Sequence, residues 1–402
     1  MNMDASTVLT EYNVIEILKV VAESCGITDW NYSVHNFESV GQNYFGVLVP
    51  FTLTGGNVNR EEVTIQLVLK LAPTDKRFRL SDAVTRMFDR EIFVYSTVLS
   101  KYQEMQKGLT ENHYIIPRCY YTSNKYCEEV IVMQDMRETG YKPYSEGAFL
   151  DLDHILVSVK ALAKFHALSF ILKQTDSKLF CEIEEKCVPL NESTDKRFFD
   201  VLKDRLQKAL DKFCNTEYVS ILSYLESNCA KYIRQATESV AETCICHGDI
   251  WKENILFKYI DFKLSEACLI DYQSSRMCSP AYDILYLITS STDSDLRHNH
   301  VGMLLDTYYK TFESYLRAAG KDAANIYPKE SFESDLKVVG PAVFIVANTA
   351  LWLSNGLQQQ GHVRSKQILS TDEEKSNAVR KYTSLIKSII DDYTSYGYLC
   401  AC

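Results

Sequence analysis

The sequence has no excess of basic residues. Its 402 residues include 43 Lys and Arg against 53 Asp and Glu, which gives a net charge of -10 at pH 7. Proteins that bind nucleic acid neutralise phosphates with clustered Lys and Arg, so this class of function has little support. Hydrophobic residues make up 46% and charged residues 24%, which is ordinary for a globular protein and excludes wholesale disorder.

Features of exported and membrane proteins are also missing. The 13 cysteines are scattered singly, without a compact disulfide framework, and the opening MNMDAST has neither the basic nor the apolar segment of a signal peptide. The uncharged stretch 338–353 is shorter than a bilayer span of about 20 apolar residues, and it contains Pro341, Asn348 and Thr349. We therefore expect a cytoplasmic protein with no membrane span, and a buried core helix at 338–353.

The patterns that are present divide the chain into two parts. Residues 1–135 combine strand-like alternation with two helical patterns, whereas residues 136–402 are mostly helical. A cleft between two unlike parts is a favoured place for a ligand. Strands are predicted at 44–51, 63–71, 115–122, 127–134, 254–257 and 266–271, and helices at 7–22, 81–104, 146–173, 196–213, 217–236, 301–318, 331–355 and 376–393.

The most informative stretch is 244–273, which reads CICHGDIWKENILFKYIDFKLSEACLIDYQ. Asn254 lies five residues after Asp249, at the start of one predicted strand, and a neighbouring strand leads to Asp271. Oxygen ligands from adjacent strand ends suit Mg²⁺, which binds one or two carboxylates together with phosphate oxygens and waters. Asp249 would lie beside this metal, where a carboxylate can accept the proton of a hydroxyl that attacks a γ-phosphorus.

This order of side chains is that of the kinase superfamily. HGD at 247–249 stands where protein kinases have HRD, and DYQ at 271–273 where they have DFG. The alternative is a tight glycine turn with a capping Asp and a surface Asn, but four fixed positions at fixed spacing arise by chance in about one such chain in several hundred. We predict an α+β, protein-kinase-like bilobal fold. Its small antiparallel-sheet N-lobe at 1–135 would bind nucleotide, and its large, mostly helical C-lobe at 136–402 would hold the catalytic loop and the substrate.

A kinase also requires a lysine that is paired with a helical glutamate. Lys70 lies near the end of the strand at 63–71, on the face opposite its apolar residues. In the following helix Glu91 lies within an apolar stripe, where a carboxylate is costly unless it is paired. We expect Lys70 and Glu91 to form this pair. The alternative is a solvated lysine and a glutamate at the edge of the core.

The phosphate-binding loop is less clear. Residues 39–46 read SVGQNYFG, and no G-x-G occurs in the chain. Gly41 permits a tight turn, so we expect the backbone around Gly41, Asn43 and Tyr44 to contact the β- and γ-phosphates. A plain hairpin turn is the alternative. Gly41 and Gly46 have the spacing of a P-loop, but the Lys and Ser/Thr that a P-loop needs are absent.

Taken together, the motifs resemble the ecdysteroid kinase-like family over about residues 35–395. They are VGQNYFG, VLKLAP, REIFVY, VIVMQDM, LAKFHALS, CHGDIWKENILF and LIDYQSSRMCSPAYDILYLI. That family is similar in fold to choline kinases and aminoglycoside phosphotransferases. The resemblance implies ATP-dependent transfer of the γ-phosphoryl group to an alcohol of a small molecule, with an ecdysteroid hydroxyl as the best guess. The chain departs from the family at Gln42, where an acidic residue is usual, and at Gly46, where Ser is usual.

By matching position, the resemblance implies a role for each motif residue. Asp249 would be the catalytic base, and Asn254 and Asp271 the Mg²⁺ ligands. Lys70 would hold the α- and β-phosphates of ATP and would be oriented by Glu91. The backbone of three residues would meet the adenine: Gln134, Asp135 and Met136.

The spacing after Asp271 bears on the size of the acceptor. Pro280 follows only nine residues later, which leaves no room for the long activation segment with which protein kinases bind peptides. A small-molecule acceptor is therefore favoured, and no obligate protein partner is evident. Two alternatives stay open: a detoxifying kinase that acts on xenobiotic or glycoside hydroxyls, and a pseudokinase that binds a ligand or a protein without turnover.

Other polar residues have plainer interpretations. Cys244, Cys246 and His247 resemble soft metal ligands, but structural zinc needs four and no second pair lies nearby, so buried small hydrophobic residues are the better interpretation. His166, on an apolar helix, is interpreted as a hydrogen-bonded core histidine rather than a substrate contact. Asp283 is interpreted as a structural residue that bonds the catalytic-loop backbone.

Overall fold

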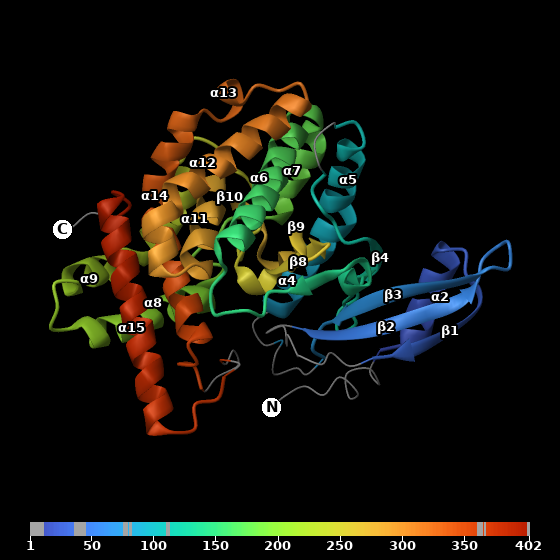
Figure 1. The fold of residues 1–402 in the computed structure, drawn as a ribbon, viewed down its shortest axis with the longest axis horizontal. Coiled ribbons are helices and arrows are strands. Elements are labelled where there is room, and N and C mark those ends of the chain that lie inside the picture. The colour runs from blue at the N-terminus through green and yellow to red at the C-terminus, as the bar shows by residue number, and fades with distance from the viewer. Residues whose placement is uncertain are drawn as a thin grey trace. The chain divides into compact units, whose positions relative to one another are not determined.

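The computed structural model describes residues 12–35, 46–74, 79, 83–109, 113–359, 365 and 367–399. The chain forms two compact units (Figure 1). Unit 1 comprises Met1–Glu104, Ile115–Lys142 and Ile270–Ser274, and unit 2 comprises Met105–Tyr114, Pro143–Leu269 and Ser275–Cys402. The short segment around Asp271 thus belongs to the unit that the N-terminal part of the chain builds.

Unit 1 contains a five-stranded antiparallel sheet. Its strands are β1 (Thr28–Val34), β2 (Val47–Gly56), β3 (Glu62–Leu71), β4 (Cys119–Ser123) and β5 (Val130–Gln134), in the spatial order β1-β2-β3-β5-β4. The antiparallel sheet predicted for the N-terminal part is confirmed. The prediction missed β1, because its side chains are almost all exposed and its sequence shows no apolar alternation.

The first helix of unit 1 forms where apolar residues recur on one face and can pack against the sheet. α2 (Val14–Ser24) buries Leu18 and Val21 against sheet residues such as Phe51, and Asn13 caps it by accepting the N–H of Glu16 at 3.2 Å. The helix predicted at 81–104 is present as three consecutive segments, the middle one π-helical. These segments are α4 (Ala83–Phe93), η1 (Val94–Leu99) and α5 (Ser100–Gln106). Three short elements come later in the chain: the 3-10 helices η2 (Met136–Thr139) and η4 (Tyr272–Ser274), and the strand β6 (Tyr141–Pro143).

Unit 2 is mostly helical, as predicted for the C-terminal part. Its helices are α6 (Leu152–Thr175), α7 (Ser177–Lys186), α8 (Lys196–Phe213), α9 (Val219–Ser227), α10 (Cys229–Glu238), α11 (Pro280–Ser291), α12 (Ser294–Ala318), α13 (Ala323–Ile326), α14 (Lys329–Ser354) and α15 (Asp372–Ser395). α12 packs along α6, and α14 packs along α11 (Figure 1). The single helix predicted at 217–236 is two helices, α9 and α10. The prediction missed α11 because all of its residues are buried and no amphipathic period marks it.

Short strands of unit 2 lead into and out of the candidate site. They are β7 (Cys244–Cys246), β8 (Ile255–Ile260), β9 (Lys263–Leu269) and β10 (Arg276–Cys278), and η3 (Lys252–Asn254) precedes β8. β7 pairs with β10, and β8 pairs with β9 so that Ile255 faces Leu269. Asn254 directly precedes β8 and Asp271 follows β9 by two residues, in agreement with the predicted strand ends.

Two helices, α6 and α14, are long and apolar enough to cross a membrane. The most apolar 18-residue window of each is largely buried inside the structure, at 78% and 72%. The core helix expected at 338–353 is confirmed as part of α14. Tertiary packing therefore accounts for the apolar composition of both helices.

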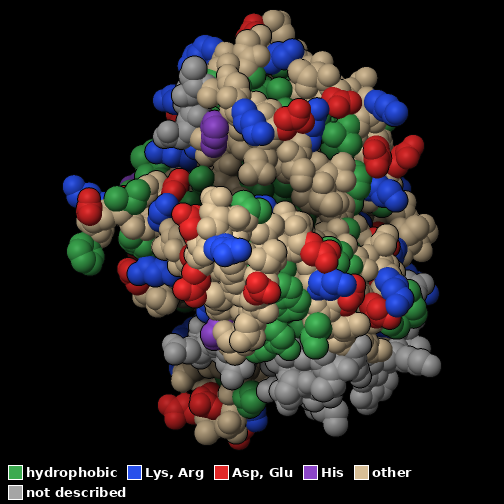
Figure 2. Space-filling view, turned by 90° about the vertical axis from the view of Figure 1, so that its right-hand side faces the viewer, with side chains coloured by type: hydrophobic (Ala, Val, Ile, Leu, Met, Phe, Trp, Pro, Cys, Tyr) green, Lys and Arg blue, Asp and Glu red, His purple; other side chains and the backbone are tan. Residues whose placement is uncertain are grey.

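Charged side chains of both signs are interspersed on the face drawn in Figure 2. Over the described residues of this face, Lys and Arg form no continuous basic field. The mixture of charges on this face agrees with the acidic net charge of the chain.

Candidate active site

Lys70, Glu91 and Asp271 meet in unit 1. Lys70 is the last residue but one of β3, and its Nζ lies 2.5 Å from Glu91 Oε2 and 2.9 Å from Asp271 Oδ1. Lys70 and Glu91 are 2% and 1% exposed, so the predicted pair is present and buried. Glu91 comes from α4, and Asp271 comes from the segment just before η4. The result is one cation held between two carboxylates.

Burial and charge act in opposite directions on this cluster. Burial alone would disfavour the Lys70 ammonium, but the carboxylates of Asp271 and Glu91 outweigh it and raise the pKa of Lys70. Burial also raises the pKa of Glu91, and the ammonium offsets only part of that effect. Lys70 therefore carries a fixed positive charge at neutral pH, as a phosphate-binding lysine requires.

The backbone at Asp271 is strained. Its φ is 69°, in the left-handed region that residues other than glycine rarely adopt. Such conformations persist where the surroundings hold them, often at functional sites. Here Lys70 holds the carboxylate, and the ring of the next residue, Tyr272, packs edge-on against Tyr95 at 5.4 Å between centroids. Tyr95 lies in η1, one turn after Glu91, so one continuous helix supports both Lys70 and the Asp271 segment.

Asp249 and Asn254 lie together in a loop of unit 2. The loop leaves β7 through Gly248, whose φ of 83° explains the glycine. Asn254 is 7% exposed, and its Nδ2 donates to the backbone oxygen of Asp249 at 2.8 Å. This bond uses the amide nitrogen of Asn254 and holds its side chain against the loop.

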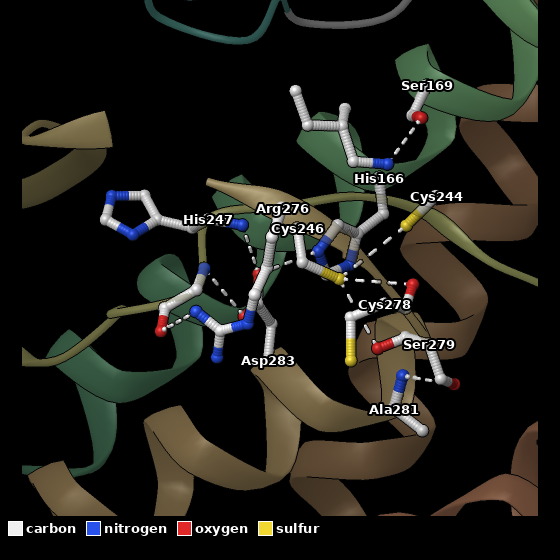
Figure 3. Close-up of polar contacts among 12 residues, drawn as sticks. His166, Ser169, Cys244, Cys246, His247, Arg276, Cys278, Ser279, Ala281 and Asp283 are labelled. Carbon is white, nitrogen blue, oxygen red and sulfur yellow. Dashed lines mark hydrogen bonds and ion pairs between the residues drawn. The ribbon is translucent and has the colours of Figure 1, made fainter. Parts of the chain in front are cut away.

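Asp283, on the first turn of α11, fixes the backbone of this loop (Figure 3). Its Oδ2 accepts the N–H of His247 at 2.5 Å, and its Oδ1 accepts the N–H of Gly248 at 3.1 Å. Arg276 donates to the carbonyl oxygen of Gly248 at 3.0 Å. The prediction that Asp283 bonds the catalytic-loop backbone is therefore confirmed.

Loss of the Asp283 charge should lower stability in a pH-dependent way. Burial opposes ionisation, but the hydrogen bond and charge of His166, with His247 and Arg276 nearby, hold the pKa of Asp283 below its ordinary value. Such a carboxylate stabilises the fold above its unfolded pKa of about 3.9, and this contribution is lost as the pH falls through the folded pKa. We expect Asp283→Asn to lower the free energy of unfolding by about 3 kcal/mol at neutral pH.

Urea unfolding at neutral pH and at about pH 3 measures this effect, because the deficit should shrink only below about pH 4. Asp261→Asn, in the exposed turn between β8 and β9, is the control and should leave stability unchanged. A deficit that stays constant down to about pH 3 would contradict a charge-dependent role for Asp283.

Tyr286 contacts Asp249, and the sequence patterns did not predict this contact. Its hydroxyl donates to Asp249 Oδ1 at 3.0 Å. Burial raises the pKa of Tyr286 well above its ordinary value, so the phenol stays protonated and remains a donor. Its ring stacks on Tyr282 at 6.1 Å, and Arg276 lies over Tyr282 at 5.0 Å. The four-residue spacing of the two tyrosines was a signal, but it has meaning only once α11 is recognised as a helix.

The predicted adenine contacts lie at the end of β5. The N–H groups of Gln134 and Asp135 donate to the carbonyl oxygens of Arg118 and Gln66 at 2.8 and 3.0 Å. Two of the three amides assigned to adenine therefore already bond within unit 1, and Met136 begins η2. Their contact with adenine stays a prediction. The phosphate-loop residues Gly41, Asn43 and Tyr44 lie outside the described residues.

Gly46 stands where the family usually has Ser, and its surroundings give a reason. A Cβ at this position would lie 3.1 Å from the carbonyl oxygen of Leu71 and 3.3 Å from the ring of Phe88. It would also lie 3.6 Å from Cγ of Lys70. The contact with Lys70 would be an ordinary one, so the two tight contacts, with Leu71 and Phe88, are the reason that glycine fits this position.

Cys244, Cys246 and His166 gather next to this loop (Figure 3). Their possible ligand atoms lie within 4.8 Å of one another, a grouping that can hold a soft metal ion. However, burial raises the pKa of both thiols, and both nitrogens of His166 have partners. Nδ1 lies 2.6 Å from the hydroxyl of Tyr308, and Nε2 lies 3.2 Å from Asp283 Oδ2. The interpretation of His166 as a hydrogen-bonded core histidine is confirmed.

The profile of the Ecdysteroid kinase-like family matches residues 40–321, well over half of the chain. The chain belongs to this family, as its motifs predicted. Its class is that of the small-molecule kinases, and its general activity is phosphoryl transfer to a small molecule. The family assignment, with a sheet-containing and a mostly helical unit, confirms the predicted α+β, protein-kinase-like fold class. Comparison with curated proteins returns no match.

Similar solved structures include three phosphotransferases. The GDP complex of wild-type aminoglycoside 2'-phosphotransferase-IIIa is 13% identical, with a TM-score of 0.43, and the match covers 95% of this chain and 99% of that one. The choline kinase LicA from Streptococcus pneumoniae is 12% identical, with a TM-score of 0.39 and coverage of 94% and 99%. A glucosamine kinase is 13% identical, with a TM-score of 0.37 and coverage of 94% and 83%. At this level of identity, the ligands of these proteins do not indicate the acceptor of this chain.

Proposed function

We propose that this protein transfers the γ-phosphoryl group of ATP to an alcohol of a small molecule, with an ecdysteroid hydroxyl as the best guess. The observation that carries the proposal is the buried cluster of Lys70, Glu91 and Asp271. Burying an ion cluster rarely stabilises a fold more than apolar residues of the same size would. Binding of a phosphate-bearing ligand explains why the cluster is present, whereas a contribution to stability does not.

In the proposed reaction each motif residue has one task. Lys70 binds the α- and β-phosphate oxygens, and Glu91 holds the ammonium in place. Asp249 accepts the proton of the acceptor hydroxyl while the oxygen of that hydroxyl forms a bond to the γ-phosphorus. The bond from the γ-phosphorus to the oxygen that bridges the β- and γ-phosphates breaks, and ADP leaves. Backbone contacts to the nucleotide are assigned to Gln134, Asp135, Met136, Gly41, Asn43 and Tyr44.

The chemistry of the donor set fits Mg²⁺. Asp271 offers carboxylate oxygens, and Asn254 offers its amide oxygen because its nitrogen already bonds the backbone of Asp249. Both are the hard oxygen ligands that Mg²⁺ takes when it also binds phosphate. When bound, Mg²⁺ neutralises charge on the phosphates. We therefore assign the metal to Asn254 and Asp271.

Transfer of label from γ-labelled ATP tests the proposal. The protein is incubated with Mg²⁺ and a panel of ecdysteroids, sterol glycosides and phenolic glucosides, and the expected result is label on an ecdysteroid. Label confined to glucosides would favour the detoxifying kinase. Binding of ATP without transfer to any alcohol would favour the pseudokinase, against which the presence of Lys70, Glu91, Asp249, Asn254 and Asp271 argues.

A further inference from the structure

Arg79 lies between β3 and α4 and is 4% exposed. Its two terminal nitrogens bond both carboxylate oxygens of Glu129, at 2.8 and 2.6 Å, and its Nε donates to the carbonyl oxygen of Pro73 at 2.6 Å. Its Nη1 also lies 3.4 Å from the hydroxyl oxygen of Thr85. Pro73 follows β3, Glu129 directly precedes β5, and Thr85 is in the first turn of α4. One side chain therefore joins three elements of unit 1.

The backbone on either side of this ion pair is bonded as well. The carbonyl oxygen of Glu129 accepts the N–H of Ala72 at 3.1 Å. The hydroxyl of Tyr12 lies 2.9 Å from the carbonyl oxygen of Ala72 and 3.1 Å from that of Glu129. Burial raises the pKa of Tyr12, so its phenol stays protonated and remains a donor. We refer to these residues as the Arg79 cluster: Tyr12, Ala72, Pro73, Arg79 and Glu129.

The contribution of this ion pair to stability does not explain its presence. Glu129 is 0% exposed, and a buried pair usually stabilises a fold no more than well-packed apolar residues of similar volume do. In some proteins buried pairs are retained because they fix one geometry. Arginine suits this task, because its planar guanidinium meets both oxygens of a carboxylate and keeps Nε for a third acceptor, here Pro73. A lysine ammonium has no such fork.

The geometry in question is that of Lys70 and Glu91. Lys70 lies on β3, two residues before Ala72, and Glu91 lies on α4. On β5, the register partner of Lys70 is Ile131, two residues after Glu129. A bond of 2.5 Å between Lys70 and Glu91 requires β3 and α4 to keep one relative placement, and the Arg79 cluster bonds the chain that connects these two elements.

We propose that Arg79 and Glu129 are positioning residues for the proposed phosphoryl transfer. Their ion pair holds β3 and α4 in the placement in which Lys70 bonds Glu91 and binds the phosphates of ATP. Both residues act through Lys70, and neither is assigned a contact with the nucleotide. The effect on ATP rests on the proposed function, whereas the hold on Lys70 does not.

Acetylation of Lys70 by acetic anhydride, without nucleotide and read by peptide mass spectrometry, tests the hold on Lys70. In the wild type Lys70 is 2% exposed and bonded to Glu91, so it should react far more slowly than Lys125, whose side chain is 69% exposed. Arg79→Lys keeps the charge but removes the planar fork, and Lys70 should lose this protection. Calorimetric titration should show ATP binding about tenfold weaker, the effect of losing about one hydrogen bond to a charged group.

Arg297→Lys is the matched control. Arg297, on α12 of unit 2, is 1% exposed and also bonds a carboxylate and a backbone oxygen. Its Nε donates to Asp392 Oδ2 at 3.0 Å, and its Nη1 donates to the carbonyl oxygen of Thr292 at 2.7 Å. Both lysine variants should lower the urea midpoint, because each loses buried hydrogen bonds. Only Arg79→Lys should expose Lys70 to the reagent and weaken ATP binding, which separates positioning from a general loss of stability.

Arg79→Met/Glu129→Leu keeps the inference testable if the single variant does not fold. Apolar residues at both positions remove the buried charges and should restore a urea midpoint close to that of the wild type. Without the ion pair between the elements, Lys70 should still lose its protection, and ATP should still bind about tenfold more weakly. Recovered stability without recovered ATP binding is a result that a purely structural role of the pair does not give.

Each remaining outcome decides the question. If Lys70 is as protected as in the wild type in a folded Arg79 variant, or is equally unprotected in Arg297→Lys, the inference is overturned. An affinity for ATP that is unchanged in a folded Arg79 variant overturns it as well. If the wild type binds no ATP while Lys70 loses its protection in Arg79→Lys alone, the proposed function fails and the hold on Lys70 stands. Phosphoryl transfer by the wild type, with Lys70 protected in both Arg79 variants, would refute the inference and leave the function standing.

Discussion

Asp249→Asn is expected to lower kcat by about 10²–10⁴-fold while leaving the affinity for ATP nearly unchanged. The amide keeps the shape of the carboxylate but cannot accept the proton of the attacking hydroxyl. Its oxygen can still accept the hydrogen bond from Tyr286, so the loop should keep its conformation. Steady-state phosphoryl transfer and titration with ATP measure the two effects separately.

Asp261→Asn again serves as the control for this experiment. Asp261 lies in the exposed turn between β8 and β9 with a φ of 49°, which asparagine adopts readily. It removes one carboxylate from the same unit without touching the catalytic loop, and turnover should be unchanged. If Asp249→Asn retained full turnover, Asp249 would not be the base.

The second large effect is expected at Lys70. Lys70→Met removes the ammonium and leaves Glu91 and Asp271 together without a cation. Removing one partner of a buried pair costs about 3–5 kcal/mol, so the free energy of unfolding should fall by that amount. ATP binding should be lost as well, because no side chain replaces the contact of Lys70 with the phosphates.

The double variant Lys70→Met/Glu91→Leu separates stability from function. Replacing both members with apolar residues removes the orphaned carboxylate of Glu91 and should recover much of the lost stability. ATP binding should not recover. Urea unfolding and ATP titration of the wild type, the single variant and the double variant give both readouts. ATP affinity retained in either variant would remove Lys70 from the nucleotide site.

Elements with a clear period were predictable from the sequence. The predicted limits of α8, 196–213, are those observed, because Phe199, Leu202 and Leu206 recur at helical spacing on one buried face. β1 and α11 were not predictable, because the first is mostly exposed and the second is buried on all sides. Periodicity carries information only where one face of an element differs from the other.

Part of the candidate site was predictable for a different reason. A glutamate within an apolar helical stripe needs a cation, and Lys70 on the preceding strand is the natural partner of Glu91. The contact between Lys70 and Asp271 joins residues 201 positions apart, and no local pattern indicates it. The hydroxyl of Tyr286 on Asp249 was equally hidden, since it depends on a helix that the sequence did not reveal.

The sequence by itself determined which functional groups this protein has and in which order they come, because motif chemistry depends on residue type and spacing. It also determined the family. Only the tertiary structure decided which groups meet, such as Asp271 with Lys70 and Tyr286 with Asp249. Contacts between distant segments depend on how whole elements pack, and that packing is not encoded in any short stretch of the chain.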